Sequence, residues 1–153
     1  TVYGNNGTAI ICSLDCYNIL IENNKVYNNT ESGITFSRNM TNSVVRNNLV
    51  RDQKYAILVS QSHNNEIYNN TISNSNPGIT LQNASSANKI YLNSIINSTN
   101  ATSIKTGAHG NMLYSNTIVL NDTTNAKAIV FDNDSKSLNN TFRDNRIVNT
   151  TKT

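Results

Sequence analysis

The sequence contains no tryptophan, a single proline, only two cysteines and few charged residues. Its apolar runs never reach the length of a membrane-spanning helix, so we expect no membrane span. Two cysteines without a further Cys or a His nearby do not make a zinc site. The lysines and arginines are scattered and form no basic run, which argues against a nucleic-acid partner. Because no segment carries an apolar stripe at helical spacing, we also expect almost no helix.

Asparagine is abundant, with 31 copies, and much of it follows one repeated pattern. The pattern is Asn-x-Φ-x-x-Asn-x-Φ, where Φ is apolar, and Asn88 to Ile95 is a clear copy. The second Asn recurs at Asn24, Asn47, Asn70, Asn93, Asn116 and Asn145, with spacings of 23, 23, 23, 23 and 29 residues. The first Asn is present at Asn42, Asn65, Asn88, Asn111 and Asn140, and the second copy places Val44 and Leu49 at its apolar positions. This register argues against a disordered Asn-rich tract and indicates a repeat protein.

A second short strand is predicted between successive Asn-bounded segments. Its copies are Ala9 to Cys12, Gly33 to Phe36, Ala56 to Val59, Gly78 to Leu81, Ser103 to Thr106 and Ala128 to Phe131. A repeat of 23 residues fits about three short strands, and it cannot bury its apolar face without stacking on its neighbours. We therefore predict an all-β fold, a parallel β-helix of about six turns whose equivalent residues stack about 4.8 Å apart. Asn suits the bends because it tolerates the left-handed backbone conformation. Residues 1–153 are expected to form one domain.

The two motifs together resemble those of a known repeat family. They are Gly-Ile-x-Φ, as in Gly33 to Phe36, followed by Asn-x-Ile-x-x-Asn-x-Ile, as in Asn65 to Ile72. They are similar to the right-handed parallel β-helix repeats of NosD-like copper-maturation proteins and of carbohydrate-binding and sugar-hydrolase domains, a group that includes alginate C5-epimerases and pectate lyases. The resemblance covers about residues 9 to 149 and implies a right-handed β-helix. It implies no single function, because these residues belong to a scaffold that carries unrelated activities.

One outward row of the predicted strands holds stacked aromatic residues. Two positions before each second Asn stand Glu22, Val45, Tyr68, Tyr91, Tyr114 and Arg143. On one interpretation, large β-forming side chains simply pack well on a strand ladder. On the other, Tyr68, Tyr91, Tyr114 and Arg143 form a platform for sugar rings or for a neighbouring protein.

Catalytic and metal-binding signals are weak. The outward positions of the second strand set, such as Thr35, Leu58 and Lys105, hold no acidic cluster, and we name no catalytic residue and no cofactor. His63 and His109 lie in bends on different turns, without an evident carboxylate partner. Asp132 and Asp134 are weak candidates for a calcium site, and a solvated acidic loop is the favoured interpretation.

Two further modifications are conceivable in an exported protein. Cys12 and Cys16 could form a local disulfide, or Cys12 could simply fill the apolar slot that Phe36 and Val59 fill later. Eleven Asn-x-Ser/Thr sequons are candidate glycosylation sites, although a chain rich in Asn, Ser and Thr produces sequons by chance. They begin at Asn6, Asn28, Asn39, Asn69, Asn83, Asn97, Asn100, Asn121, Asn133, Asn139 and Asn149.

The leading hypothesis is a noncatalytic exported β-helix that acts as a structural or adhesive module at the cell surface or outside the cell. No amphipathic capping helix flanks the repeats, so either flanking residues are missing or copies stack end to end into a filament. The chain begins at Thr1 with neither Met nor signal peptide, so we expect a mature product or an excised fragment. The alternatives are a carbohydrate-active β-helix that binds, cleaves or epimerises a polysaccharide, and a NosD-like periplasmic accessory protein. Sparse His, Cys and Met argue against direct copper handling.

Overall fold

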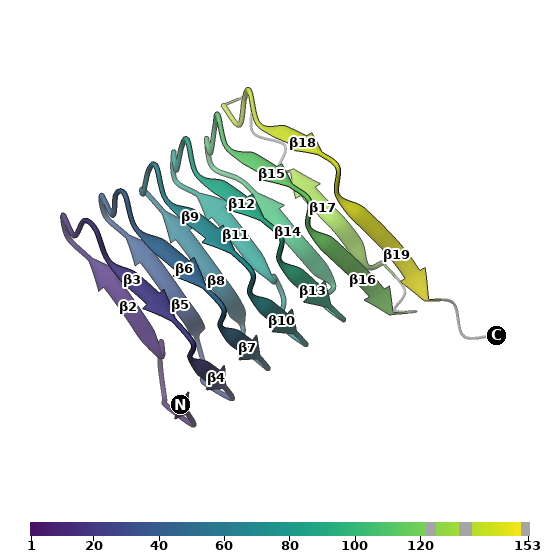
Figure 1. The fold of residues 1–153 in the computed structure, drawn as a ribbon, viewed down its shortest axis with the longest axis horizontal. Helices are drawn as coiled ribbons and strands as arrows, with labels where there is room; N and C mark the ends of the chain where they lie inside the picture. The colour runs from purple at the N-terminus through teal and green to yellow at the C-terminus, as the bar shows by residue number, and fades with distance from the viewer. Residues whose placement is uncertain (122–124, 132–135, 151–153) are drawn as a thin grey trace.

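The computed structural model describes residues 1–121, 125–131 and 136–150, and in these ranges the chain is a parallel β-helix (Figure 1). The chain coils through about six turns, and each turn adds one strand to each of three parallel sheets. The turns follow one another from the N-terminus at one end of the long axis to the C-terminus at the other (Figure 1). Within the described ranges there is no helix, and hence none that could cross a membrane. The predicted all-β solenoid with three strands per turn is confirmed.

The three sheets are named here by their order in the first full turn. The first sheet contains β1 (Val2–Tyr3), β4 (Lys25–Tyr27), β7 (Leu49–Arg51), β10 (Thr71–Ser73), β13 (Ser94–Ile96), β16 (Thr117–Asn121) and β19 (Arg146–Thr150). The second contains β2 (Ile10–Ser13), β5 (Ser32–Ser37), β8 (Tyr55–Ser60), β11 (Ile79–Gln82), β14 (Asn100–Ile104) and β17 (Lys127–Phe131). The third contains β3 (Leu20–Glu22), β6 (Val44–Arg46), β9 (Glu66–Tyr68), β12 (Lys89–Tyr91), β15 (Met112–Tyr114) and β18 (Thr141–Arg143).

The interior is filled by columns of aliphatic side chains, with one residue from each turn. Two such columns are Ile67, Ile90 and Leu113 in the third sheet and Ile72, Ile95 and Ile118 in the first, all at most 2% exposed. Burying one such side chain contributes about 2 kcal/mol, so the stacking of turns provides the stability that an isolated turn lacks.

Two corners of the solenoid are held by ladders of buried asparagine side chains. At the corner between the third and first sheets, Asn93 is 1% exposed. Its Oδ1 accepts hydrogen bonds from the backbone N–H and Nδ2 of Asn70, and its Nδ2 donates to Oδ1 of Asn116, all at 3.0 Å. The same bonds recur at Asn88, between Asn65 and Asn111, at the corner between the second and third sheets. The predicted role of Asn as a corner residue is therefore confirmed, and the ladders satisfy backbone groups that the bends leave unpaired.

The residue before each ladder position adopts the left-handed backbone conformation. Asn23, Asn47 and Asn69 have φ values of 58°, 56° and 52°, each one residue before the ladder residues Asn24, Asn48 and Asn70. An Asn-Asn doublet is thus the natural corner sequence, because Asn tolerates positive φ and its successor supplies the ladder amide. The next strand often begins with Thr, so sequons such as Asn69-Asn70-Thr71 arise from the scaffold itself. The sequon Asn of such a corner is exposed, whereas the ladder Asn is buried.

The predicted register of the second turn is wrong by one residue. Asn48 occupies the ladder in place of Asn47, and Ser43 takes the place predicted for Asn42. Val45 and Val50 are fully buried in place of Val44 and Leu49. Either residue of the doublet Asn47-Asn48 can serve as the second Asn of the motif, and because Asn48 does so, the turn spacings are 24 and 22 residues where 23 and 23 were predicted.

The strand in the fifth copy of the second sheet is also displaced from its predicted register, here by two residues. Thr102 lies opposite Ile79, and Ile104 lies opposite Leu81. The prediction had placed Ile104 opposite Ile79. A shift of two keeps the same side chains inward, so the alternation of apolar residues cannot detect it. Ser103 consequently takes the place predicted for Lys105 in the outward row. Thr80, which lies opposite Ser103 in that row, is fully buried.

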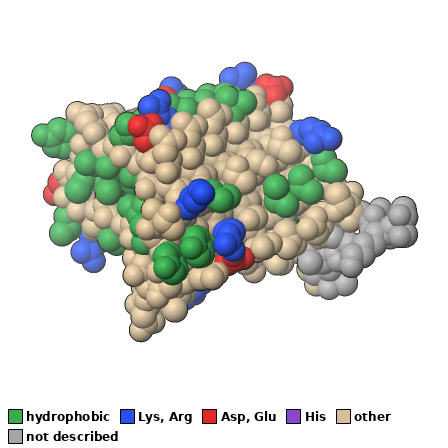
Figure 2. Space-filling view, turned by 60° about the horizontal axis from the view of Figure 1, so that its bottom comes forward, with side chains coloured by type: hydrophobic (Ala, Val, Ile, Leu, Met, Phe, Trp, Pro, Cys, Tyr) green, Lys and Arg blue, Asp and Glu red, His purple; other side chains and the backbone are tan. Residues whose placement is uncertain are grey.

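Both ends of the described solenoid expose apolar side chains. In the first turn Ile11, Leu14 and Leu20 are 58%, 64% and 51% exposed. In the last, Phe131 and Ile147 are 52% and 51% exposed. Figure 2 shows apolar side chains gathered toward the end formed by the first turn. Within each end turn, one edge of every sheet has no neighbouring strand among the described residues.

Candidate functional site

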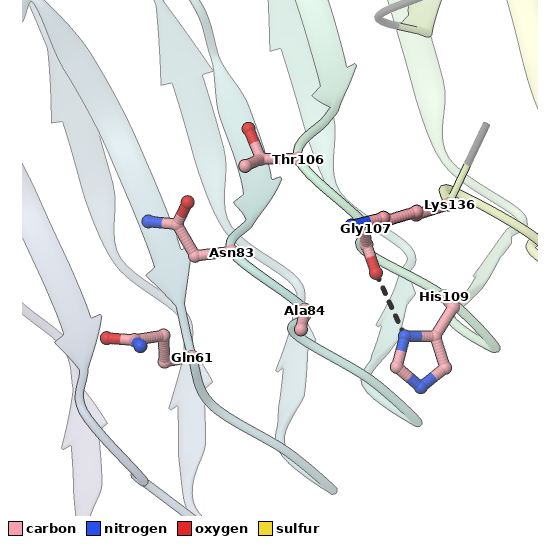
Figure 3. A pocket seen from close by; sticks show the side chains of 7 residues that line it. All are labelled: Gln61, Asn83, Ala84, Thr106, Gly107, His109 and Lys136. Carbon is pink, nitrogen blue, oxygen red and sulfur yellow. Dashed lines mark hydrogen bonds between the residues drawn. The ribbon is translucent and has the colours of Figure 1, made fainter. Parts of the chain in front are cut away.

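A surface groove follows the bends that leave the strands of the second sheet. One part is a hollow of about 650 Å³ lined by Gln61, Asn83, Ala84, Thr106, Gly107, His109 and Lys136 (Figure 3). Another, of about 480 Å³, is lined by Leu14, Asp15, Arg38, Asn39, Gln61 and His63. Gln61 lines both hollows, so they adjoin along the long axis, and we call the residues of the two hollows together the bend groove.

The bend groove exists because equivalent bends turn outward in successive turns. Gln61, Asn83 and Thr106 have φ values of 50°, 53° and 53°, just after β8, β11 and near the end of β14. The Ala84 N–H donates to the Thr106 carbonyl at 2.9 Å, and the Asn83 Nδ2 donates to Ser60 Oγ at 2.8 Å. Figure 3 shows the side chains of Gln61, Asn83 and Thr106 on three neighbouring strands of the ribbon. The groove therefore offers amide and hydroxyl groups at intervals of one turn.

Isolated β-bridges align the two histidines of the groove with a serine between them. His63, Ser86 and His109 occupy equivalent positions on three successive turns. His63 Nδ1 lies 2.8 Å from Ser86 Oγ, and His109 Nδ1 donates to the Gly107 carbonyl at 2.9 Å (Figure 3). Burial, and after it the charge of His109, lowers the pKa of His63, so this imidazole stays neutral to lower pH than usual. The sequence analysis placed both histidines in bends on different turns, and the signal that aligns them with Ser86 is the same 23-residue period that separates His63, Ser86 and His109.

The charged residues of the groove are mainly cationic. Arg38 lines one part and Lys136 the other, while the Asp15 carboxylate accepts a hydrogen bond from Asn39 Nδ2 at 2.9 Å. Guanidinium and ammonium groups pair with carboxylates, and amides and hydroxyls hydrogen-bond to sugar hydroxyls. The groove can therefore bind a hydroxyl-rich, negatively charged chain. Sequence reasoning missed it because its residues share a bend position and have no common side-chain type.

The aromatic row predicted from the sequence forms a continuous stack on the third sheet. The Tyr68 and Tyr91 rings lie 4.8 Å apart at 12°, and the Tyr91 and Tyr114 rings lie 4.9 Å apart at 7°. The guanidinium of Arg143 lies over Tyr114, 5.1 Å from its centroid. Arg46, not the predicted Val45, continues the row, and its Nη1 donates to the Tyr68 hydroxyl at 3.0 Å.

This stack leaves no open face on its central ring. Both faces of Tyr91 are covered by its neighbours, and its hydroxyl donates to Glu66 Oε2 at 3.0 Å. A sugar usually packs on the face of an aromatic ring, so Tyr91 can offer a ligand only its edge. The geometry favours the packing interpretation, and a ligand-binding role of Tyr68, Tyr91, Tyr114 and Arg143 stays a prediction.

The surroundings of Tyr91 predict a loss of stability at high pH. Burial and the hydrogen bond to Glu66 raise the pKa of Tyr91, so the folded state holds a proton that the unfolded chain releases above about pH 10. The stability that this group contributes is complete below that pH and is lost as the pH rises above it. We expect urea denaturation to show a steeper loss of unfolding free energy above about pH 10 in the wild type than in Tyr91→Phe. Parallel profiles would contradict the assignment.

The remaining predicted residues fall into two groups. Asp132, Asn133 and Asp134 lie outside the described residues. Cys12 and Cys16 are both partly buried and not bonded to each other; burial, and after it the Cys16 thiol, raises the pKa of Cys12. Among the described residues, no group of three or more His, Cys, Asp or Glu side chains could hold a metal ion.

Comparisons with known proteins give one family and one set of similar structures. The model of the family described as "Periplasmic copper-binding protein (NosD)" matches residues 1–111. No curated protein sequence matches the chain. The crystal structure of the periplasmic alginate epimerase AlgG is similar, with a TM-score of 0.67 and 19% identity over 98% of this chain and 38% of that one. A double mutant and a single mutant of AlgG give TM-scores of 0.64 and 0.55, with 19% and 18% identity and the same coverage. The chain thus spans 38% of the length of these structures.

Proposed function

Since the chain belongs to the NosD family of periplasmic proteins, which places it among exported proteins, we propose that it is a noncatalytic β-helix that holds an acidic polysaccharide in the bend groove. The observation that carries the proposal is the groove itself, with Arg38 and Lys136 at separate points along the axis and polar bend residues between them. A module of this kind would serve adhesion to polysaccharide at the cell surface or in the periplasm.

The spacing of the turns supports a polymeric ligand. Equivalent groups of Gln61 and Asn83 recur one turn apart, which is about 4.8 Å in a parallel sheet and similar to the length of one sugar ring. An extended polysaccharide laid along the axis would present one residue to each turn. Separate cations can then pair with carboxylates on different sugar units.

Alginate, a polymer of uronic acids, is the first ligand to test. The likeness to the alginate epimerase concerns the fold, at 19% identity, and suggests only the class of ligand. The proposal is noncatalytic because no pair of carboxylates for acid-base chemistry lies among the described residues of the groove. A neutral histidine can itself act as a base, so the product analysis described below tests this part of the proposal.

The test is binding of alginate oligosaccharides by isothermal titration calorimetry. Replacing both Arg38 and Lys136 with alanine should weaken binding at least about 10-fold, because each lost charge pair removes on the order of 1 kcal/mol. The matched control replaces Lys25 and Lys54, two exposed cations outside the groove, and should bind as the wild type does. If both double variants weakened alginate binding equally, net charge alone would explain the effect, and the groove assignment would be wrong. New double bonds or altered sugar configuration after incubation with alginate would overturn the noncatalytic assignment.

A second proposal is that copies of the chain stack end to end. The exposed apolar residues of the first turn, including Ile11 and Leu20, and of the last, including Phe131 and Ile147, would cover one another, and the open sheet edges would pair. Negative-stain electron microscopy of concentrated protein should show filaments with the width of one solenoid. Replacing Ile11 and Ile147 with lysine should abolish them, and monomers at every concentration in the wild type would contradict stacking.

A further inference from the structure

Both histidines of the chain lie in the bend groove, with a serine between them. His63 lines one hollow and His109 lines the other, and the bridges align them with Ser86 on the turn between. Adjacent turns are about 4.8 Å apart, so a ligand group that lies over Ser86 is about 5 Å from each flanking turn. One small anionic group can therefore interact with both imidazoles, and we call these three residues the histidine column.

The hydrogen bonds of the histidine column change when the imidazoles are protonated. His109 Nδ1 donates to the Gly107 carbonyl at 2.9 Å (Figure 3), so Nε2 is the nitrogen that gains the second proton. His63 Nδ1 lies 2.8 Å from Ser86 Oγ. In the imidazolium form this Nδ1 must donate to Ser86 Oγ, which leaves the Ser86 hydroxyl proton for a ligand. Protonation therefore turns the whole column into hydrogen-bond donors, two of them positively charged.

Among the residues that the structure describes, no carboxylate pairs with either imidazole. Glu66 pairs with Lys89 at 3.2 Å, and the Asp15 carboxylate accepts a hydrogen bond from a side-chain amide at 2.9 Å. The other charged or titratable groups on the flanking elements are Tyr17, Arg38, Lys105 and Lys136. Apart from burial, the charge that acts on His63 is that of His109, so a carboxylate bound between the two histidines would relieve their mutual repulsion.

We propose that the histidine column is a subsite for one sugar carboxylate in the middle of the bend groove, and that protonation of its imidazoles tightens the hold of the groove on an acidic polysaccharide. The column lies between Arg38 in one hollow and Lys136 in the other, so a polymer that follows the axis passes over it. An imidazolium forms charge-assisted hydrogen bonds with a carboxylate, whereas a neutral imidazole offers only a neutral donor. This inference rests on the proposed function, because it assigns a further site for the same ligand.

The direction of the pH dependence follows from linkage. A carboxylate binds the imidazolium form more tightly, so ligand binding takes up protons and the Kd falls as the pH falls. Imidazole groups ordinarily gain their proton at about pH 6.5, and the lowered pKa of His63 moves its share of the effect to more acidic solution. Carboxyl groups ordinarily titrate at about pH 4, so the sugar carboxylates keep their charge in this range. The groove therefore changes its affinity between about pH 5 and about pH 7.5 while its ligand does not change.

The test is isothermal titration calorimetry of the full chain with alginate oligosaccharides at about pH 5.5 and about pH 8, at equal ionic strength. We expect the Kd to be about 10-fold lower at the acidic pH. In the double variant His63→Gln with His109→Gln this ratio should fall below about 2, and in Ser86→Ala, which keeps both charges, it should lie between. Carboxyl-reduced alginate oligosaccharides, which keep the hydroxyl groups and lose the charge, are the matched control ligand and should show no such ratio. Titrations in buffers of different ionisation enthalpy should show proton uptake by the wild type and none by the double variant.

Circular dichroism checks that the variants keep the fold. Equal Kd values at the two pH values in the wild type, or an unchanged ratio in the folded double variant, overturn the histidine column as a subsite and leave the proposed function standing. Binding without proton uptake in the wild type overturns it as well. If alginate binds at neither pH, the proposed function fails and this inference fails with it.

Discussion

Replacing Asn93 with alanine is expected to lower the unfolding free energy by roughly 4 kcal/mol, because several buried polar groups lose their partners together. The amide of Asn93 accepts from the backbone N–H of Asn70 and donates to the carbonyls of Ile67 and Tyr91. Each buried group left unpaired costs about 1 to 3 kcal/mol. Domains of this size have a total stability of only about 5 to 15 kcal/mol, so one ladder position carries a large share.

Urea denaturation followed by far-ultraviolet circular dichroism measures this effect. Asn6→Ala is the control, since Asn6 is exposed, does not adopt the left-handed backbone conformation and accepts a hydrogen bond from the exposed Thr30 hydroxyl at 3.3 Å, so its loss should cost less than about 0.5 kcal/mol. Asn145→Ala should fall between the two, because this last ladder residue is only partly buried. A cost below about 1 kcal/mol for Asn93→Ala would show that water readily replaces the ladder amide.

Replacing Gly78 with alanine is expected to destabilise the chain by about 2 kcal/mol or more, through overpacking. An added Cβ would lie 2.7 Å from the Ala101 carbonyl oxygen and 2.9 Å from Ile95 Cγ2. The carbonyl belongs to the neighbouring strand and cannot move without disturbing the sheet, so the strain must spread into the adjoining turns. In the same column Ala56 and Ala101 are fully buried one turn earlier and one turn later, so Gly78 lies between two buried methyl groups.

Thermal unfolding of Gly78→Ala and Gly110→Asn separates this overpacking from general effects of losing a glycine. Gly110 has φ of 61°, and an added Cβ would meet no atom within 4 Å. Asn stands at the equivalent bend in other turns, as at Asn64, so the control should match or exceed the wild-type Tm. An unchanged Tm in Gly78→Ala would contradict the close contact with the Ala101 carbonyl.

The repeat was predictable because two independent signals coincide. Corner asparagines and alternating aliphatic residues both recur once per turn, and together they indicate the three-sheet solenoid. The register was harder to predict where one signal is ambiguous. At Asn47-Asn48 either residue fits the motif, and only burial of Val45 and Val50 decides between them. At Ile104 a shift of two residues preserves the inward face, and only the observed pairing with Leu81 decides.

The candidate sites were predictable to different degrees for a related reason. The stack of Tyr68, Tyr91 and Tyr114 follows directly from equal spacing of one residue type. The bend groove does not, since Gln61 and Thr106 share a backbone conformation and no side-chain chemistry.

The asparagine ladders have a consequence for how such molecules change in length. Because the amide of Asn93 offers Asn70 the same bonds that Asn116 offers Asn93, these interior turns present matching ladder bonds to their neighbours. Deleting or duplicating one unit between such corners would shorten or lengthen the molecule while leaving its cross-section unchanged. Any surface that follows the axis would then become longer or shorter by one turn at a time. Under the proposed polysaccharide-binding role, the number of units alone would then set the length of polymer that one molecule binds, without new side chains.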